Sequence, residues 1–155
     1  MGILGKVTET GHGLILALQD ATEQTWNTIK VWTSTTDFAG TTLKVLPDNA
    51  ARGSLTSYTT LGTTAVSNWA VAEMSDYSAI FQNLGSTQSD SFGTTYDANV
   101  NAYITTGVGG TALDDACGYW SATEKDGGTA WAFNRVFWGY SEKKNSLNVR
   151  PVLGF

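Results

Sequence analysis

The sequence of 155 residues contains seventeen glycines, which favour turns. Their number and distribution constrain the fold more than any other feature of the sequence. The apolar runs between the glycines are short, and the run at residues 13–18 has the length of a buried strand rather than of a helix. Few segments keep a 3.6-residue hydrophobic period, whereas the abundant Thr, Tyr, Trp, Phe and Val residues favour strands. The sequence therefore predicts a single α+β domain over residues 1–155, rich in loops.

Two segments carry the periodicity of a helix. The stronger one covers residues 69–84, with Gly85 as its stop signal, and the second runs from about residue 96 to residue 105. The predicted apolar positions are Met74, Tyr77, Ile80, Phe81 and Leu84 in the first segment, and Val100, Tyr103 and Ile104 in the second. Residues 26–34 fit a strand or a helix equally well, and residues 47–52 could open a short helix at a proline.

From Gly118 onward the hydrophobic period changes to two, which is typical of strands. The predicted strands cover residues 119–123, 130–138 and 149–153, and they are separated by a glycine turn and by a polar turn region. Trp120 is predicted to lie in the core. Pro151 lacks a backbone N–H, so it predicts that the last strand lies at a sheet edge or loses a ladder hydrogen bond. Near the other end, residues 6–9 are predicted to pair with residues 13–18 as a hairpin.

The net charge of the chain limits the classes of molecule that it is expected to bind. Nine basic and 14 acidic side chains give a net charge of −5 and a pI near 4.6, which argues against nucleic-acid binding. No apolar run is close to the length of a membrane-spanning helix, which needs about 18 residues. The sequence begins without the basic and apolar regions of a secretory signal, although it could be a piece excised from a longer surface or fibre protein.

Residue types that enzymes use for catalysis are sparse. The single cysteine, Cys117, excludes an internal disulfide, and with the single histidine, His12, it cannot form a Cys/His metal site. His12 lies between two glycines in a predicted turn. Cys117 follows the acidic pair Asp114 and Asp115, so we expect a small buried hydrophobe rather than a reactive thiolate. That acidic pair could bind a cation, but such pairs more often lie in solvated loops.

The sequence also lacks a P-loop and a dinucleotide-binding fingerprint. We therefore expect no enzyme activity, no cofactor and no metal.

The last third of the chain combines aromatic rings with Arg and Asn side chains. On a continuous strand, Trp131, Phe133, Arg135 and Phe137 would share one face, and Asn134, Val136 and Trp138 the other. Neither face is purely apolar, so a simple core-and-solvent assignment fails. Rigid rings beside adaptable amides are typical of recognition surfaces. The alternative is that these aromatic residues belong to the core.

Several segments of the chain resemble the C-terminal domain of bacterial collagen-like adhesins and related gut-bacterial surface proteins. They also resemble the variable proteins of diversity-generating retroelements, which share the C-type-lectin-like fold. The similar segments are GYWSATE at residues 118–124, AW at 130–131, VRPVLGF at 149–155, GLILALQDA at 13–21, WAVAEMSD at 69–76 and ANVNAYI at 98–104. The YWSATE and VRPV pieces are specific in combination, and residues 30–65 have no counterpart.

The resemblance implies a twisted antiparallel sheet with two helices and long loops, in a domain that binds ligands without catalysing a reaction. In retroelement-diversified members the varied residues face solvent on the C-terminal strands and loops. The corresponding ligand-binding candidates here are Trp131, Asn134, Arg135, Phe137, Trp138, Tyr140, Glu142, Lys143, Asn145, Leu147 and Asn148. Glu124 borders them, and Arg150 is expected to be a buried ion-pair partner. The expected ligand is a protein or glycan on another cell or host surface, which places this domain at a cell surface, outside the cell or at a phage tail tip.

Two departures from the family limit what the resemblance implies. The family usually has proline where Ala72 stands, which affects the start of the first helix. The residue triplets of calcium-dependent sugar-binding lectins are missing, so calcium-dependent carbohydrate binding is not implied. A fibre tip or trimerisation domain, in which copies of the chain bury the aromatic surface, is the alternative function. A third alternative is a relative of the formylglycine-generating enzyme, which shares the broader fold, but that chemistry needs reactive cysteines and a single cysteine fits it poorly.

Overall fold

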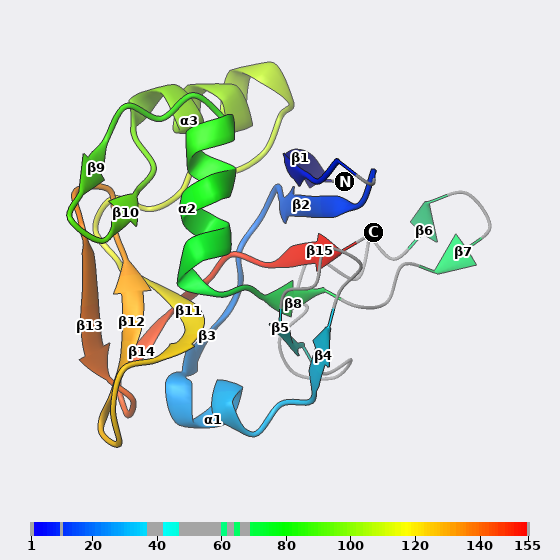
Figure 1. Cartoon of the computed structure of the whole chain (residues 1–155). Helices are drawn as coiled ribbons and strands as arrows, with labels where there is room; N and C mark the ends of the chain where they lie inside the picture. Colours follow the sequence, from blue (N-terminus) through cyan, green and yellow to red (C-terminus); the bar gives the residue numbers. More distant parts are fainter. Residues whose placement is uncertain are drawn as a thin grey trace.

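The computed structural model describes residues 2–9, 11–36, 42–46, 60–61, 64–65 and 69–154. Within them the chain forms the predicted α+β structure, with short helices and mostly antiparallel sheets (Figure 1). The strands are β1 Gly2–Val7, β2 Gly13–Ala17, β3 Ala21–Thr25, β4 Ser34–Thr36, β5 Thr42–Val45, β6 Thr60–Leu61, β7 Thr64–Ala65, β8 Ala70–Val71, β9 Ser89–Asp90, β10 Gly93–Thr94, β11 Tyr119–Glu124, β12 Thr129–Phe133, β13 Trp138–Glu142, β14 Ser146–Val149 and β15 Val152–Gly154. The helices are α1 Trp26–Lys30, α2 Met74–Asn83 and α3 Ala98–Ala102, and a π-helical segment Tyr103–Gly107 continues α3. The short helix predicted at residues 47–52 lies outside the described residues.

Two larger sheets organise the described part of the chain. One has the strand order β1-β2-β15-β8-β5-β4, so the first and last described strands lie in the same sheet. The other has the order β13-β12-β11-β14-β3, in which β11 and β14 are parallel and the remaining neighbours are antiparallel. Helix α2 contacts both sheets, through β1 and β11, and the β12–β13 hairpin lies at the outer side of the second sheet (Figure 1).

The predicted hairpin near the N-terminus is confirmed. Strand β1 pairs with β2 in antiparallel register, with Ile3 opposite Leu16 and both side chains buried. Gly5 allows α2 to approach this strand, because a Cβ atom there would lie 2.6 Å from a side-chain carbon of Ile80. A side chain at position 5 would therefore push helix and strand apart.

Helix α2 is shorter than its predicted range of residues 69–84. Its first backbone N–H, at Met74, donates to the Thr123 hydroxyl of β11 at 2.9 Å, whereas residues 70–71 form β8 between β15 and β5. The run before the helix is buried without any period, so tertiary pairing decides its conformation. The predicted end is confirmed. Gly85 has φ +89°, its N–H donates to Gln82 O, and the Ser86 N–H donates to Phe81 O, as in a Schellman motif.

The second predicted helix is present as α3 and the π-helical segment after it. The Asp97 carboxylate caps α3 by accepting hydrogen bonds from the N–H groups of Asn99 and Val100, at 2.9 and 3.1 Å. Val100 and Ile104 are buried as predicted. Tyr103 is 50% exposed, so its assignment to the apolar stripe was wrong.

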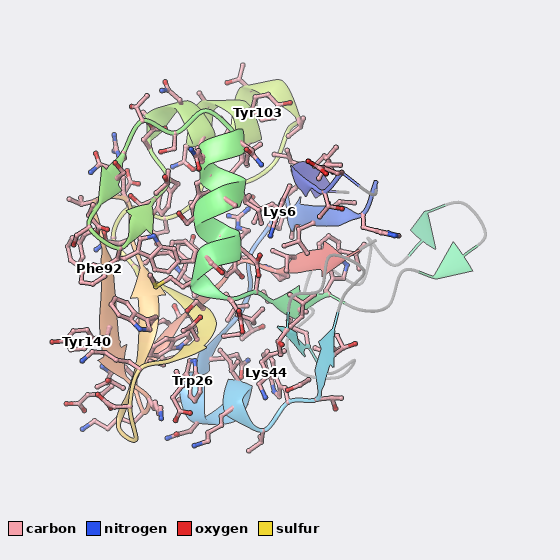
Figure 2. The ribbon with its side chains drawn as sticks, in the orientation of Figure 1. Lys6, Trp26, Lys44, Phe92, Tyr103 and Tyr140 are labelled. Atoms are coloured by element: carbon pink, nitrogen blue, oxygen red, sulfur yellow. The ribbon has the colours of Figure 1, made fainter. Side chains whose placement is uncertain are left out.

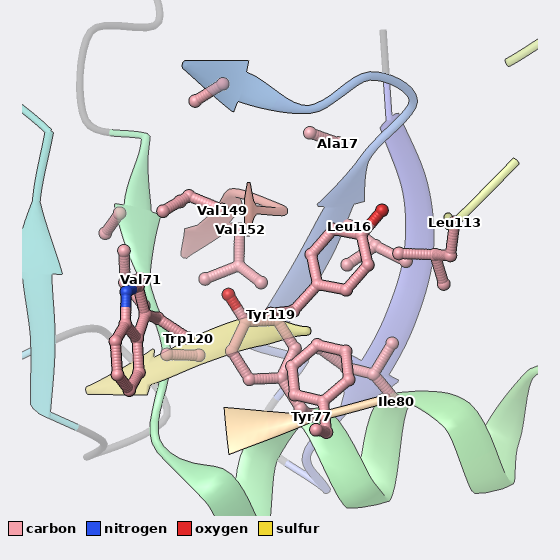
Figure 3. Close-up of a cluster of buried hydrophobic side chains, with 14 of the residues drawn as sticks. Leu16, Ala17, Val71, Tyr77, Ile80, Leu113, Tyr119, Trp120, Val149 and Val152 are labelled. Carbon is pink, nitrogen blue, oxygen red and sulfur yellow. The ribbon is translucent and has the colours of Figure 1, made fainter. Parts of the chain in front are cut away.

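The core lies between α2 and the two sheets (Figure 3). Phe133 stacks on Tyr119 with ring centroids 5.4 Å apart and tilts against Tyr77 of α2 at 4.9 Å. Trp120 is fully buried, as predicted, and its indole N–H donates to Gln24 O at 2.8 Å. None of the helices in the described ranges combines the length and apolar character needed to span a bilayer.

The end of the chain crosses from one large sheet to the other. The predicted strand at residues 149–153 is divided at Arg150 and Pro151 into β14 in the five-stranded sheet and β15 in the six-stranded sheet. Strand β15 lies between β2 and β8, so the prediction of an edge strand was wrong. Pro151 precedes the strand, where a missing N–H costs no ladder hydrogen bond, and its carbonyl accepts from Ala17 N at 2.8 Å.

Arg150 is fully buried and ion-paired, as the resemblance implies. Its Nε lies 2.6 Å from Oδ1 of Asp20. Its NH1 and NH2 groups donate to the carbonyls of Ala17, Thr111 and Ala112 at 3.0 to 3.3 Å. The Arg150 guanidinium therefore holds the loop before β11 against the segment between β14 and β15, where the chain changes sheets.

Candidate functional site

The candidate ligand-binding residues differ widely in exposure. Arg135, Phe137, Tyr140, Glu142 and Asn145 are exposed, Trp131, Asn134 and Leu147 are half-buried, and Trp138, Lys143 and Asn148 are buried. Most of the set therefore does lie at the surface of the β12–β13 hairpin and of the turns beside it. The three buried residues are corrections to the expectation that the whole set faces solvent.

Trp138 is part of the core. Its side chain is 2% exposed, and its ring centroid lies 5.0 Å from that of Phe133 on the neighbouring strand. Its indole N–H donates to the Thr94 carbonyl of β10 at 3.0 Å. A ring that is already shielded from water gains nothing by desolvation on binding, so Trp138 cannot be the contact residue that we expected.

Lys143 and Asn148 have structural partners. The Lys143 ammonium bonds to the Glu124 carboxylate and to the carbonyls of Asp126 and Gly127, and it lies 4.8 Å from the Trp26 ring centroid. It thereby holds the turn between β11 and β12. Asn148 pairs with Tyr119 in the parallel part of the sheet, which buries its side chain.

A tight turn at residues 134–137 replaces the second half of the strand predicted at residues 130–138. The Asn134 side-chain oxygen accepts hydrogen bonds from the N–H groups of Val136 and Phe137, at 2.8 and 3.0 Å. Asn134 therefore shapes the turn with the atom that could otherwise bind a ligand. Because the turn resets the register, Trp138 is the cross-strand partner of Phe133 and points to the same side of the sheet.

The short β9–β10 hairpin supports this turn from outside the C-terminal third. The Gln88 and Thr95 side chains donate to the carbonyls of Val136 and Arg135, both at 3.0 Å. The Asp90 carboxylate accepts the Trp138 N–H at 2.7 Å. Backbone groups of the turn are thus fixed, while the side chains of Val136 and Phe137 remain 60% and 50% exposed.

A pocket of about 160 Å³ opens beside this turn. Its lining residues are Gly118, Ala132, Phe133, Asn134, Phe137, Gly139, Tyr140, Ser141 and Leu147. Four of them, Asn134, Phe137, Tyr140 and Leu147, belong to the set predicted from sequence. The pocket exists because small residues occupy adjacent strands: Ala132 and Gly139 are cross-strand partners. Sequence reasoning missed these small lining residues, because a missing side chain leaves no chemical signal.

A second hollow, of about 390 Å³, lies at the other end of the hairpin, beside the turn between β11 and β12. Its walls include Glu142, Lys143 and Lys144. The Lys143 ammonium points to protein acceptors, and Glu142 and Lys144 pair with each other at 2.6 Å. This hollow therefore lacks the aromatic rim of the first pocket, and we treat the first pocket as the candidate site.

Three contacting rings, which we name the aromatic row, lie along the β12–β13 hairpin. Trp131 and Tyr140 are cross-strand partners with ring centroids 6.2 Å apart, and Phe92 lies 4.9 Å from Trp131. Phe92 and Tyr140 lie on the same side of the molecule, along β13 (Figure 2). Sequence reasoning missed Phe92, which stands at the tip of the β9–β10 hairpin.

Other reactive groups do not assemble into a catalytic constellation among the described residues. Cys117 is half-buried rather than buried as expected, and the Asp114 carboxylate raises the pKa of its thiol, which disfavours the thiolate. Exposed Asp115 pairs with Arg135 at 2.8 Å. In the part of the chain that the structure describes, no three His, Cys, Asp or Glu side chains gather as a metal site.

The turn between β11 and β12 yields a pH prediction. The Asp126 carboxylate accepts the Thr129 hydroxyl at 2.7 Å and the backbone N–H groups of Gly128 and Thr129 at 2.9 and 2.7 Å, and these bonds lower its pKa from 3.8 to about 2. The unfolded chain binds this proton more readily, so the contribution to stability is complete above pH ~4 and is lost as the pH falls through ~2. We expect NMR titration of the Asp126 side-chain carbon to show a midpoint near pH 2.

Asp126→Asn provides the control for that titration. This variant should lack the part of the stability change that wild type shows between about pH 4 and pH 2. A midpoint near the ordinary value of 3.8 would mean that the turn hydrogen bonds do not form in solution.

Comparison with known proteins does not assign this chain to a family. No protein-family model matches the chain, and no curated protein is significantly similar to it in sequence.

Proposed function

We propose that this chain is a non-enzymatic ligand-binding domain with a C-type-lectin-like fold. The pocket beside the Asn134–Phe137 turn holds part of a protein or glycan ligand, and the exposed Phe137 ring supplies its apolar rim. The domain works at a cell surface or outside the cell, where the exposed side chains of the C-terminal strands determine which ligand binds. In this proposal they correspond to the varied positions of the retroelement-diversified proteins that the sequence resembles.

The arrangement of the two sheets supports the fold assignment. The first and last described strands share a sheet, and α2 packs against β1 of that sheet. The strands after residue 118 form most of a second sheet, whose outer hairpin carries exposed side chains. This arrangement agrees with the twisted antiparallel sheet, helices and long loops that the resemblance implies.

The pocket is the observation on which the binding proposal depends. Its volume of about 160 Å³ suits one side chain or part of one sugar ring rather than a whole small-molecule ligand, since drug-sized sites measure about 300–1,000 Å³. The Phe137 ring beside it remains 50% exposed. An exposed ring beside a preformed hollow provides apolar area at low cost in side-chain entropy, as in protein recognition surfaces.

Filling the pocket is expected to abolish binding without unfolding the domain. In Gly139→Val, the added Cβ would lie 3.0 Å from a ring carbon of Phe137, which is exposed enough to move aside. Valine also suits a strand better than glycine, so the free energy of unfolding should stay within about 1 kcal/mol of wild type. Affinity for a pocket ligand should fall at least about tenfold, which corresponds to about 1.4 kcal/mol.

Two probe collections test this proposal without a known ligand. Immobilised wild type is screened against a random-peptide phage library and against a printed glycan array, and every hit is measured again on Gly139→Val. Gly107→Val, in the π-helical segment outside the pocket, is the matched control. Hits that bind wild type and the control but not Gly139→Val support the proposal. Failure of both collections to yield a hit, or hits that bind Gly139→Val equally well, would overturn it.

A further inference from the structure

The three rings of the aromatic row are inclined to one another, and two of them are exposed. The ring planes of Phe92 and Trp131 are inclined by 53°, and those of Trp131 and Tyr140 by 86°. Phe92 and Tyr140 are 53% and 60% exposed, and Trp131 is half-buried between them. Mutually inclined rings cannot form one flat platform, but they can contact a compact group from more than one side.

A cation already occupies one end of the row. The Lys125 ammonium lies 3.5 Å from the centroid of the Tyr140 ring, within the range of a cation–π contact. Its ion-pair partner, Asp126, is 3.7 Å away and half-exposed. Lys125 is joined to the row by one flexible side chain, so it can leave the ring when another cation competes.

Two carboxylates lie near the same surface, those of Asp90 and of Glu142, which pairs with Lys144. Asp90 lies directly beneath the Phe92 tip, where its Oδ1 accepts the N–H groups of Phe92 and Gly93 at 2.7 and 3.1 Å. Glu142 is two residues from Tyr140 on β13, so both side chains leave the same side of the strand. With a net charge of −5 for the whole chain, this setting favours a positively charged ligand group over an anionic one.

We propose that the aromatic row binds a basic side chain, arginine or lysine, of a partner protein, and that Lys125 occupies the row until the partner displaces it. The inference goes beyond the proposed function, because it requires neither the pocket nor its ligand; Tyr140 alone belongs to both sites. Lys125 thereby acts as a built-in competitor that weakens the binding of every other cation.

The test uses two small probes that differ in charge. N-acetylarginine methylamide and its neutral isostere, N-acetylcitrulline methylamide, are titrated into the ¹⁵N-labelled protein, and the indole N–H signal of Trp131 is followed by NMR. We expect the arginine probe to shift this signal with saturation and the citrulline probe to bind much more weakly. Lys125→Gln should tighten arginine binding about two- to fivefold, the size of one exposed cation–π contact. Tyr140→Leu should weaken it by at least that factor.

Matched variants separate this site from general attraction to an acidic protein. Lys30→Gln removes the same charge as Lys125→Gln from an exposed lysine of α1 that pairs with Glu124 at 3.4 Å, and Tyr103→Leu removes an exposed tyrosine from the π-helical segment. Neither should change arginine affinity more than about 1.5-fold. Equal binding of the citrulline probe, no Trp131 shift, or no tightening in Lys125→Gln would each overturn the proposal. None of these outcomes depends on the pocket tested by Gly139→Val.

Discussion

Replacing Trp138 with alanine is expected to lower the free energy of unfolding by about 3–5 kcal/mol. The ring is 2% exposed, packs against Phe133 and donates a hydrogen bond to Thr94 O. Its removal leaves a large cavity under the β9–β10 hairpin and an unpaired carbonyl. The loss is a large part of the about 5–15 kcal/mol that stabilises a typical domain. Urea denaturation followed by far-UV circular dichroism measures it.

Tyr140→Ala is the matched control for Trp138→Ala. Tyr140 is two residues further along the same strand and on the same side of it, but it is 60% exposed. Replacing Tyr140 with alanine should lower the free energy of unfolding by about 1 kcal/mol or less. If Trp138→Ala is too unstable to purify, Trp138→Phe keeps most of the packing and should lose about 1 kcal/mol with the hydrogen bond. Equal costs at positions 138 and 140 would contradict the assignment of one ring to the core and the other to the surface.

Arg150→Ala should destabilise the domain by a similar amount, about 3–5 kcal/mol. The guanidinium is fully buried, and its removal leaves the Asp20 carboxylate without its ion-pair partner. The Thr111 and Ala112 carbonyls also lose their hydrogen-bond donor. Asp20 is 25% exposed and keeps the hydrogen bond from the Tyr119 hydroxyl, so the emptied space and the unpaired carbonyls add to the lost ion pair, and the effect exceeds that of a surface pair. Chemical denaturation of the purified variant gives the change directly.

Arg135→Ala is the control that separates burial from ion pairing. Arg135 lies 2.8 Å from Asp115, which is close to the separation of the buried pair, but both side chains are about half exposed. Water and salt screen such a pair, so its loss should cost no more than about 1 kcal/mol. A loss below 1 kcal/mol for Arg150→Ala would contradict the role of Arg150 in holding the loop before β11 to the point where the chain changes sheets.

Local signals predicted the elements that depend on local interactions. The Gly85 stop of α2, the buried run of β2 and the core position of Trp120 all appear in the structure. Residues 69–72 were misassigned to the helix, because a continuous apolar run carries no period and its pairing with β5 and β15 is decided elsewhere in the chain.

Sequence reasoning identified many of the residues near the candidate site, but it did not predict to which side of the sheet their side chains point. A continuous strand over residues 130–138 would place Trp138 with Asn134 and Val136, whereas the turn places it opposite Phe133. This turn is held partly by Gln88, Asp90 and Thr95, which are about 40 or more residues away in sequence. No local pattern could reveal those partners, and a changed register moves every following side chain to the other face.

We propose that ligands bind at the pocket beside the Asn134–Phe137 turn. Chemical-shift mapping of a selected peptide or glycan on the ¹⁵N-labelled protein distinguishes binding at this pocket from binding at any other surface. We expect the largest shifts at the backbone amides of Gly118, Phe137, Gly139 and Leu147, with β1 and β4 unchanged. Shifts centred on the β1 or β4 edge, with those four amides unmoved, would contradict it.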